Sequence, residues 1–378
     1  MTKRFSTPLC ALCKPSTRPP SQVTQKLLLG LSLFILIACQ SEPVTTHKSS
    51  SAAQQKRMLE AKSAILALDE ARLEILLPQI DVNAPLADHS SLLAWAVETQ
   101  NERMVNDLLN EGANANGVEG NRFSPIILAC RYGNASIISA LLNSGAKPLN
   151  AIEDGTSAFH LCASTATADI LSDMISRGAN VHIGNNRGQT PLMFAANAGK
   201  TDVMSYLIDH GADINQQTEE GFSALFFAVK SHNLNAIRTL ISRGANLHTQ
   251  TKDGTTVAQL AVYSKNYLFL TWLTSQMDVL MSPAFITATL NAYDRNGHQL
   301  LHAAVIANRT ELVAALLARG ANPAATSAPS RLKWRYEPNF KTEDYIPPQL
   351  TPIDIAVERK LDVISTLLTE ALESRPHS

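Results

Sequence analysis

Few residues in this chain combine into a pattern that could do covalent chemistry. The sequence contains no His-Glu-x-x-His and no Gly-x-Ser-x-Gly, and no Cys-x-x-Cys pair follows residue 38. Gly199, Lys200 and Thr201 match the end of a phosphate-binding loop, but Phe194 stands where that loop requires a glycine. We therefore expect no catalytic site, no metal and no cofactor, and we predict that the protein is not an enzyme.

Cys39 is the residue whose surroundings predict a covalent modification. Residues 1–38 carry five basic and no acidic side chains, and residues 27–38 form an apolar run. A basic segment, an apolar segment and a small residue before a cleavage point are typical of a secretory signal. The run from Leu36 to Cys39 resembles the bacterial lipobox, which implies cleavage before Cys39 and lipidation of it, for example by palmitate. Gln40 in place of aspartate then implies an outer membrane lipoprotein that faces the periplasm.

Residues 39–57 are predicted to be the lipidated cysteine and a flexible tether, because they show no apolar period. Removal of the signal peptide, residues 1–38, takes away five positive charges and leaves the mature chain with a net charge of −6. This balance argues against nucleic acid as a partner. A start of translation near Val23 would give a more compact signal, and Cys10 and Cys13 lie in the segment that is removed.

A period of 33 residues governs the rest of the chain. Related six-residue segments begin at Ser91, Ser124, Ser157, Thr190, Ser223 and Thr256, and two more follow after longer gaps at Gln299 and Thr351. Most of these starts are followed 21 residues later by Gly-Ala, at Gly112, Gly145, Gly178, Gly211, Gly244 and Gly320. Self-similarity at such a period indicates stacked supersecondary units rather than separate globular domains.

These markers resemble the ankyrin repeat, most closely in residues 186–215. The resemblance implies an all-α fold, an ankyrin-repeat solenoid of about eight to nine helix-turn-helix repeats with short β-turn fingers, over residues 58–375. Repeats are expected to start near residues 58, 91, 124, 157, 190, 223, 256, 299 and 351. In this fold the Ser or Thr at each start caps the first helix. The resemblance also gives His160 and His302 a structural hydrogen-bonding role.

Cys130 and Cys162 occupy interior first-helix positions in neighbouring repeats. We expect both to act as small buried hydrophobic side chains. Packed helices are usually about 10 Å apart, which is beyond the distance that a disulfide can bridge. A disulfide between them is therefore not expected, although a secreted location would permit one.

The resemblance also indicates where a partner would bind. In this family, contacts come from turn residues beside the turn glycine and from exposed residues near the end of the first helix. The turn positions are Phe123, Arg187, Gln189, Glu219, Glu220, Phe222 and Asp253, with Asn121, Asn186, Lys252, Arg295 and His298 beside them. The helix positions are Arg131, Tyr132, Lys230 and Tyr263. Aromatic and Arg side chains carry most interface energy, although each aromatic could instead pack on a neighbouring repeat.

Two insertions interrupt the period, at about residues 275–293 and 326–348. We expect the first to form a lengthened or additional helix that covers the groove between repeats. The second is expected to extend a turn on the binding side, and it contains Trp334, Arg335 and Tyr336. Long ordered loops are often functional, but packing of these side chains on the last repeats remains the alternative.

The sequence thus predicts a monomeric, non-enzymatic protein-binding lipoprotein of the bacterial envelope, anchored in the membrane through its lipid. It would recognise a protein partner through the concave face of the repeats, as an immunity-type inhibitor of an effector that attacks the envelope. The alternative is a scaffold or stabiliser of a periplasmic enzyme or envelope assembly.

Overall fold

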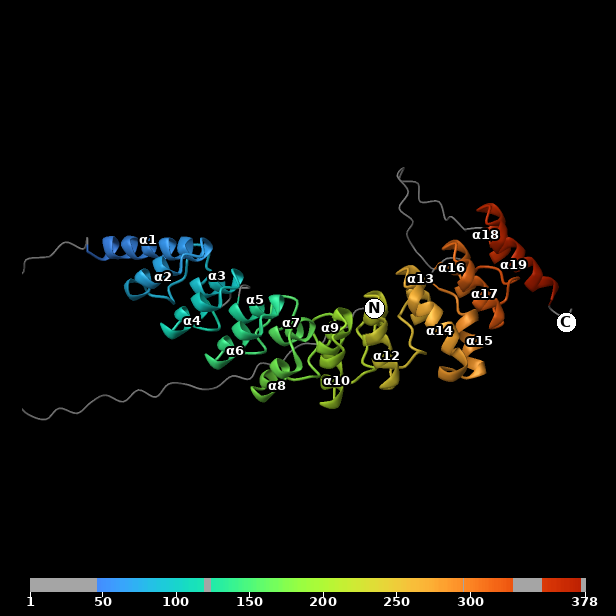
Figure 1. Cartoon of the computed structure of the whole chain (residues 1–378), viewed down its shortest axis with the longest axis horizontal. Coiled ribbons are helices and arrows are strands. Elements are labelled where there is room, and N and C mark those ends of the chain that lie inside the picture. Colours follow the sequence, from blue (N-terminus) through green and yellow to red (C-terminus); the bar gives the residue numbers. More distant parts are fainter. Residues whose placement is uncertain (1–45, 119–123, 295, 329–348, 375–378) are drawn as a thin grey trace, which may run out of the picture. The chain divides into compact units, whose positions relative to one another are not determined.

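The computed structural model describes residues 46–118, 124–294, 296–328 and 349–374 (Figure 1). The chain divides into a unit of residues 1–47 and a compact unit of residues 48–378. The described part is helical, and its only extended features are two isolated bridges, between Ala151 and Ser157 and between Gln250 and Thr256. The predicted all-α class and ankyrin-repeat architecture are confirmed.

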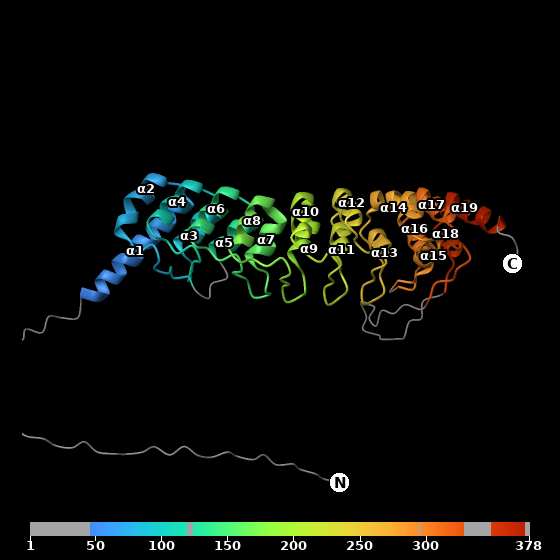
Figure 2. The same cartoon turned by 90° about the horizontal axis from the view of Figure 1, so that it is seen from below.

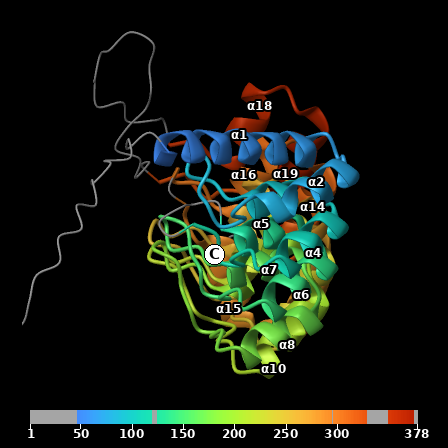
Figure 3. The ribbon, with the colours of Figure 1, turned by 90° about the vertical axis from the view of Figure 1, so that its left-hand side faces the viewer.

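Within residues 48–378 the helices alternate between a first and a second helix of each repeat. The first helices are α3 (Leu92–Glu98), α5 (Pro125–Tyr132), α7 (Ala158–Thr165), α9 (Pro191–Ala198), α11 (Ala224–Lys230), α13 (Val257–Tyr263), α16 (Leu300–Ile306) and α18 (Pro352–Glu358). The second helices are α4 (Glu102–Asn110), α6 (Ala135–Asn143), α8 (Ala168–Ser176), α10 (Thr201–Asp209), α12 (Leu234–Ser242), α14 (Tyr267–Leu280), α17 (Thr310–Ala318) and α19 (Asp362–Glu373). Each first helix contacts the first helix of the next repeat, and the turns between repeats gather on one side of the helices (Figures 2 and 3).

The predicted side-chain helix caps are present at Ser91, Thr256 and Thr351. Ser124 and Ser223 begin their helices without a side-chain capping hydrogen bond. The Ser91 hydroxyl accepts a hydrogen bond from the backbone N–H of Ala94 at 3.1 Å, and the Thr256 hydroxyl accepts one from Gln259 N–H at 3.2 Å. Proline occupies the first helical position of α5, α9 and α18, where its missing N–H costs no hydrogen bond. These local signals fix where each first helix begins.

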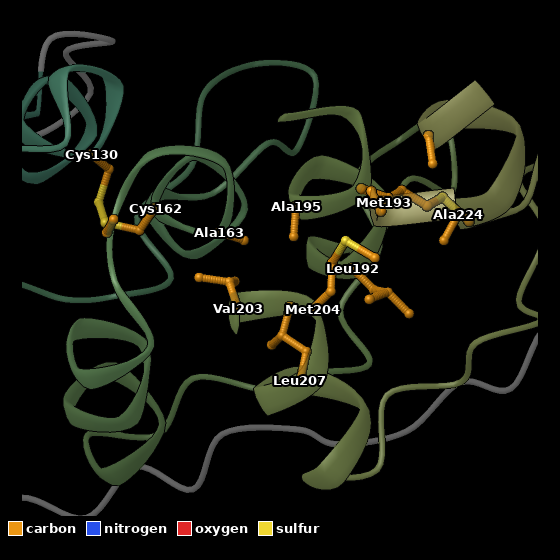
Figure 4. Close-up of a cluster of buried hydrophobic side chains, with 14 of the residues drawn as sticks. Cys130, Cys162, Ala163, Leu192, Met193, Ala195, Val203, Met204, Leu207 and Ala224 are labelled. Atoms are coloured by element: carbon orange, nitrogen blue, oxygen red, sulfur yellow. A yellow bond between two sulfur atoms is a disulfide. The ribbon is translucent and has the colours of Figure 1, made fainter. Parts of the chain in front are cut away.

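The core consists of thin layers of Leu, Ile, Val and Ala between the repeats (Figure 4). Three large rings are fully buried, those of Phe159, Phe226 and Phe269. Three other aromatics that the repeat pattern also places in the core, Trp95, Phe194 and Trp272, are only partly buried and pack against its edge.

The expectation that the two repeat cysteines stay unpaired is wrong, because Cys130 and Cys162 form a disulfide with their Cα atoms 4.5 Å apart (Figure 4). Both side chains are fully buried. Helices α5 and α7 converge at this point, where the Thr165 hydroxyl donates a hydrogen bond to the carbonyl of Cys130. A Cβ added at Gly133, which ends α5, would lie 2.9 Å from the Cβ of Thr165. The typical helix separation used in the prediction is an average along two helices, and it does not hold where they cross closely.

The predicted tether is also wrong for residues 46–57, because helix α1 (Thr46–Leu66) starts there. Met58, Ala61 and Ile65 of α1 are buried, and α2 (Glu70–Leu76) and the short 3₁₀ helix η1 (Leu77–Gln79) follow. Ala, Gln, Lys and Arg are good helix formers. The helix can therefore extend from its buried residues towards the N-terminus through a segment that has no apolar period. The absence of that period is what predicted a flexible tether.

The first insertion forms both a lengthened helix, α14, and an additional helix, α15 (Pro283–Asn291). Ile286 and Leu290 of α15 are buried. Two glutamines of the repeat framework hold the end of α15, because Gln259 Nε2 donates to the carbonyl of Ala292 at 2.9 Å and Gln299 Nε2 donates to that of Asn291 at 3.1 Å. The insertion is thus part of the packed structure.

Candidate partner-binding surface

The turns between repeats are tied to one another by backbone hydrogen bonds. The N–H of Asn186 donates to the carbonyl of Asp154 at 2.9 Å, and the N–H of Lys252 donates to that of Glu220 at 3.0 Å. Gly221 has a φ of +87°, and a Cβ on it would lie 2.9 Å from the Cα of Thr251. Neighbouring turns therefore approach too closely for a side chain at this position, and they present their outer residues on a pre-organised frame.

A groove of about 350 Å³ lies between the turns that precede α9 and α11 and the end of α11. We call it the aromatic groove; it is lined by Asn186, Arg187, Gln189, Thr218, Glu219, Glu220, Phe222, Phe226, Phe227, Lys230 and Leu260. Seven of the residues proposed from the sequence meet in it: Asn186, Arg187, Gln189, Glu219, Glu220, Phe222 and Lys230.

Three phenylalanines form the floor of the aromatic groove. The ring of Phe222 meets that of Phe226 edge to face at a centroid distance of 5.7 Å, and its centroid lies 6.3 Å from that of Phe227. Phe226 is fully buried, whereas Phe222 and Phe227 are half-buried. The ring of Phe222 therefore packs on its own repeat and also lines the groove, so packing and exposure to a partner do not exclude each other here.

Four charged side chains surround this floor: Arg187, Glu219, Glu220 and Lys230. All four are exposed, and none forms an ion pair within the part of the chain that the structure describes. The charges lie at different ends of the groove: both glutamates are on the turn that precedes α11, and Lys230 is the last residue of α11. A partner can therefore approach an apolar floor between charges of both signs.

The other helix and turn positions lie outside the aromatic groove. Arg131 and Tyr132 end α5, and Tyr132 is 46% exposed. The Tyr132 hydroxyl donates to Glu98 Oε1 at 2.6 Å, and this bond to a carboxylate raises the pKa of Tyr132. Asp253 is exposed on the next turn, where its carboxylate accepts from the hydroxyl of Thr251 and stabilises the turn.

Several sequence predictions fall outside the described residues. These are the lipidation site Cys39, the turn residues Asn121, Phe123 and Arg295, and Trp334, Arg335 and Tyr336 of the second insertion. They remain predictions.

A second hollow, which the sequence analysis did not identify as a site, lies between the repeats that start at Thr256 and Gln299. We call it the basic cleft; it measures about 540 Å³ and is lined by Val262, Tyr263, Lys265, Tyr267, Asn296, His298, Ala303, Ile306, Ala307 and Arg309. Only Tyr263 and the turn residue His298 stood among the proposed positions. The basic residue that closely follows each of these first helices, Lys265 or Arg309, is the signal that could have revealed the cleft.

The two repeat histidines have the structural surroundings that the family resemblance implies. His160 Nδ1 lies 2.8 Å from the Ser157 hydroxyl, and its Nε2 lies 3.1 Å from the carbonyl of Gln189. His302 Nε2 lies 3.1 Å from the carbonyl of Leu350. Burial lowers the pKa of both histidines, and that of His302 falls to about 4. Both therefore serve the fold as neutral side chains.

No group of three His, Cys, Asp or Glu side chains that could hold a metal ion occurs among residues 46–118, 124–294, 296–328 and 349–374. Across the same ranges, no helix combines the length and the apolar character needed to cross a bilayer.

Comparison with known families agrees with the repeat architecture. The model of ankyrin repeats in three copies matches residues 93–183 and 159–251, and the model of the single ankyrin repeat matches residues 296–328. Together these matches cover just over half of the 378 residues. No curated protein matches the chain in the corresponding search. Ankyrin repeats form protein–protein interaction domains, and this chain belongs to the ankyrin repeat family.

Proposed function

We propose that this protein is a non-enzymatic binder of another protein and that it recognises this partner through the aromatic groove. The observation that carries the proposal is that seven residues selected by their position in the repeat line one groove with an aromatic floor. Interface energy is concentrated in aromatic and Arg anchors that a partner can desolvate. Phe222, Phe227 and Arg187 supply such anchors.

The frame around the groove supports binding without rearrangement. The turns that carry Arg187 and Glu220 are linked to their neighbours by the backbone hydrogen bonds of Asn186 and Lys252. A surface that is already ordered loses little conformational entropy on association. Recognition therefore rests on complementary shape and charge.

The proposal includes an anchor and a location. Lipidation of Cys39 holds the repeats at the outer membrane, on the periplasmic side, and the protein acts there as an immunity-type inhibitor that intercepts an effector which attacks the envelope. The run Leu36 to Cys39 supports the anchor. The disulfide between Cys130 and Cys162 supports an oxidising compartment, because disulfides persist there and are rare in the cytosol.

Capture of the partner tests the binding proposal. Full-length protein is cross-linked in intact cells and purified, and the proteins bound to wild type, Phe222→Ala, Arg187→Glu with Lys230→Glu, and Asp202→Ala are compared. Asp202 is an exposed residue of α10 away from the groove and serves as the matched control. We expect the groove variants to lose a partner that the control retains. Retention of every partner by the groove variants would refute the choice of surface.

The anchor is tested separately by labelling cells with a fatty-acid analogue. Wild type should incorporate the label and fractionate with the outer membrane, whereas Cys39→Ala should do neither. The identity of the captured partner then separates inhibition from the alternative. An incoming toxic effector whose activity falls on binding supports inhibition, and a resident envelope protein whose lifetime rises on binding would establish the scaffold role instead.

A further inference from the structure

The basic cleft gathers positive charge from two neighbouring repeats. Lys265 follows the end of α13, and Arg309 immediately precedes α17. Both line the cleft together with His298 from the turn before α16. No described acidic residue lines it. The aromatic groove, by comparison, contains two glutamates beside Arg187 and Lys230, so it offers charges of both signs, whereas the charged side chains that line the basic cleft are positive.

Arg309 is positioned by a contact with an aromatic ring rather than by an ion pair with a carboxylate. Its guanidinium carbon lies 4.0 Å from the centroid of the Tyr267 ring, a cation–π contact. Within the described ranges it forms no ion pair. Other arginines of the repeats are engaged with acidic side chains, Arg243 with Asp209 and Arg319 with Asp278. Arg309 therefore keeps its hydrogen-bond donors for a ligand.

A third cation lies beside the wall of the cleft. Arg359, from the last repeat, donates to the carbonyl of Ile306 at 3.0 Å. Burial lowers the pKa of His298, the charge of Asp294 raises it, and the charge of Arg359 lowers it. The positive field of Arg359 thus reaches a residue that lines the cleft.

Asp294 is the acidic residue nearest in the chain to the residues that line the cleft, and its carboxylate accepts hydrogen bonds from the backbone of the turn in which it lies. Asp294 is buried, and its Oδ1 accepts hydrogen bonds from the N–H groups of Asn296 at 2.8 Å and His298 at 2.7 Å. These bonds order the turn that carries His298. Asp294 therefore shapes the cleft without lining it.

Apart from Asn296, the remaining wall of the cleft is largely apolar and includes Val262, Tyr263, Ile306 and Ala307. Tyr263 is 36% exposed and Ile306 is half-buried. A ligand that fits must therefore offer anionic groups and apolar groups side by side. A peptide with alternating acidic and apolar side chains does so, whereas a phosphate polymer offers charge without an apolar surface.

We propose that the basic cleft binds an acidic segment of a protein partner, with a carboxylate on the guanidinium of Arg309 and with Lys265 adding positive charge. Arginine pairs with carboxylates in a bidentate geometry that fixes orientation as well as charge. The apolar neighbours of the carboxylate pack on Ile306 and Tyr263. This inference rests on the proposed function in that the ligand is a protein, but it concerns a different site.

The test uses a fluorescent peptide of alternating glutamate and leucine, and the same peptide with glutamine in place of glutamate. Binding to the full-length protein is followed by fluorescence anisotropy. We expect the glutamate peptide to bind and Arg309→Gln with Lys265→Gln to weaken it by about tenfold or more, which is a loss of about 1.4 kcal/mol or more. Arg309→Lys should weaken it by less, because the charge remains without the bidentate geometry.

Lys147→Gln is the matched control, because it removes one positive charge from an exposed side chain that lines neither the basic cleft nor the aromatic groove, and it should leave this affinity unchanged. Circular dichroism of each variant establishes that it is folded. Equal binding of the glutamine peptide, absence of binding by the glutamate peptide, or an unchanged affinity in the double variant would overturn the proposal. Tighter binding of polyphosphate at Arg309 and Lys265 than of the peptide would overturn it in favour of a polyanion.

The outcome is independent of the aromatic groove. Loss of peptide binding in the cleft variant together with full partner capture by Phe222→Ala would leave the acidic-segment site standing and reject the proposed groove. The opposite pair of results would reject the cleft and keep the groove.

Discussion

His160 and His302 occupy the same position in two repeats, one in the regular part of the chain and one beyond the first insertion. His160 engages both ring nitrogens, Nδ1 with Ser157 and Nε2 with the carbonyl of Gln189. His302 keeps only the second of these contacts, to Leu350, and its buried Nδ1 has no hydrogen-bond partner among the described residues. The difference traces to the repeat start, which is Ser157 in one case and Gln299 in the other.

The glutamine that replaces Ser or Thr has a different task. Gln299 donates to the carbonyl of Asn291 and Gln259, at the histidine position of the preceding repeat, donates to that of Ala292. Both bonds satisfy carbonyls at the C-terminal end of α15, which an isolated helix leaves without partners. The interrupted part of the solenoid thus uses side-chain amides at framework positions to dock an inserted helix, and Gln259 does so while it keeps its hydrogen bonds to Thr256.

The regular part also contains a covalent link, the Cys130–Cys162 disulfide. Breaking it should cause the largest loss in the free energy of unfolding among the changes considered. The bond closes a loop between residues 32 apart. Loop-closure entropy predicts a loss of about 3–4 kcal/mol in the free energy of unfolding. We expect Cys130→Ala with Cys162→Ala to unfold at lower denaturant concentration than the oxidised wild type. Reduced wild type is the control and should match the variant; equal midpoints for oxidised and reduced protein would contradict the prediction.

The second largest effect is expected from acid, which should lower the stability of the protein by protonating the two buried histidines. The folded-state pKa of His302 is about 4, below its ordinary value of 6.5, because burial disfavours the charged ring. The unfolded chain therefore takes up the proton first as pH falls. Stability from this residue is complete above pH 6.5 and is lost progressively towards pH 4. The loss is about 3 kcal/mol.

Denaturant unfolding at neutral pH and near pH 4 measures this loss. His302→Gln removes the titrating group and can still donate to the carbonyl of Leu350, so we expect the variant to lose less stability in acid than wild type. The pKa of His160 is lowered in the same direction, and His160→Gln is the matched variant from the regular part. If His302→Gln loses as much stability in acid as wild type, the burial of His302 is not the source of the pH dependence.

Replacement of Gln259 should release the inserted helix. Gln259→Ala removes the donor to Ala292 and the acceptor of the Thr256 N–H, at a cost of about 1–3 kcal/mol. Gln259→His restores the framework residue found at His160 and should cost less. Both variants should speed amide hydrogen exchange in α15, and exchange in α9 of the regular part provides the internal reference. Unchanged exchange in α15 would show that this glutamine does not dock the helix.

The smallest effect is expected from Gln299→Ser, which converts the surroundings of His302 into those of His160. The new hydroxyl can satisfy His302 Nδ1, while the bond to Asn291 is lost. These changes oppose each other, so the net change in stability should be about 1 kcal/mol or less. The nitrogen chemical shift of His302 Nδ1 reports the new bond directly. An unchanged shift would mean that the missing hydroxyl is not the cause of the unpaired nitrogen.

The regular repeats could be predicted almost entirely from the sequence. The spacing of Ser91, Ser124 and their successors, the glycines at the ends of second helices and the small alanines are local signals that recur, so each repeat reinforces the reading of the others. The candidate groove followed from the same register, because Phe222 and Arg187 are placed by their distance from a repeat start. The docking role of Gln259 and Gln299 could not be found in this way, since it exists only where the period is broken.

The sequence by itself determined the periodic features: the helical repeats, the starts of their first helices and the positions of the turns between them. Only the tertiary structure decided the disulfide of Cys130 with Cys162 and the basic cleft around Arg309, which are contacts between repeats, and the start of α1 at Thr46. The physical reason is the range of the interactions. Caps and apolar periods act within a few residues, whereas the separation of two helices at one point depends on every side chain packed between them.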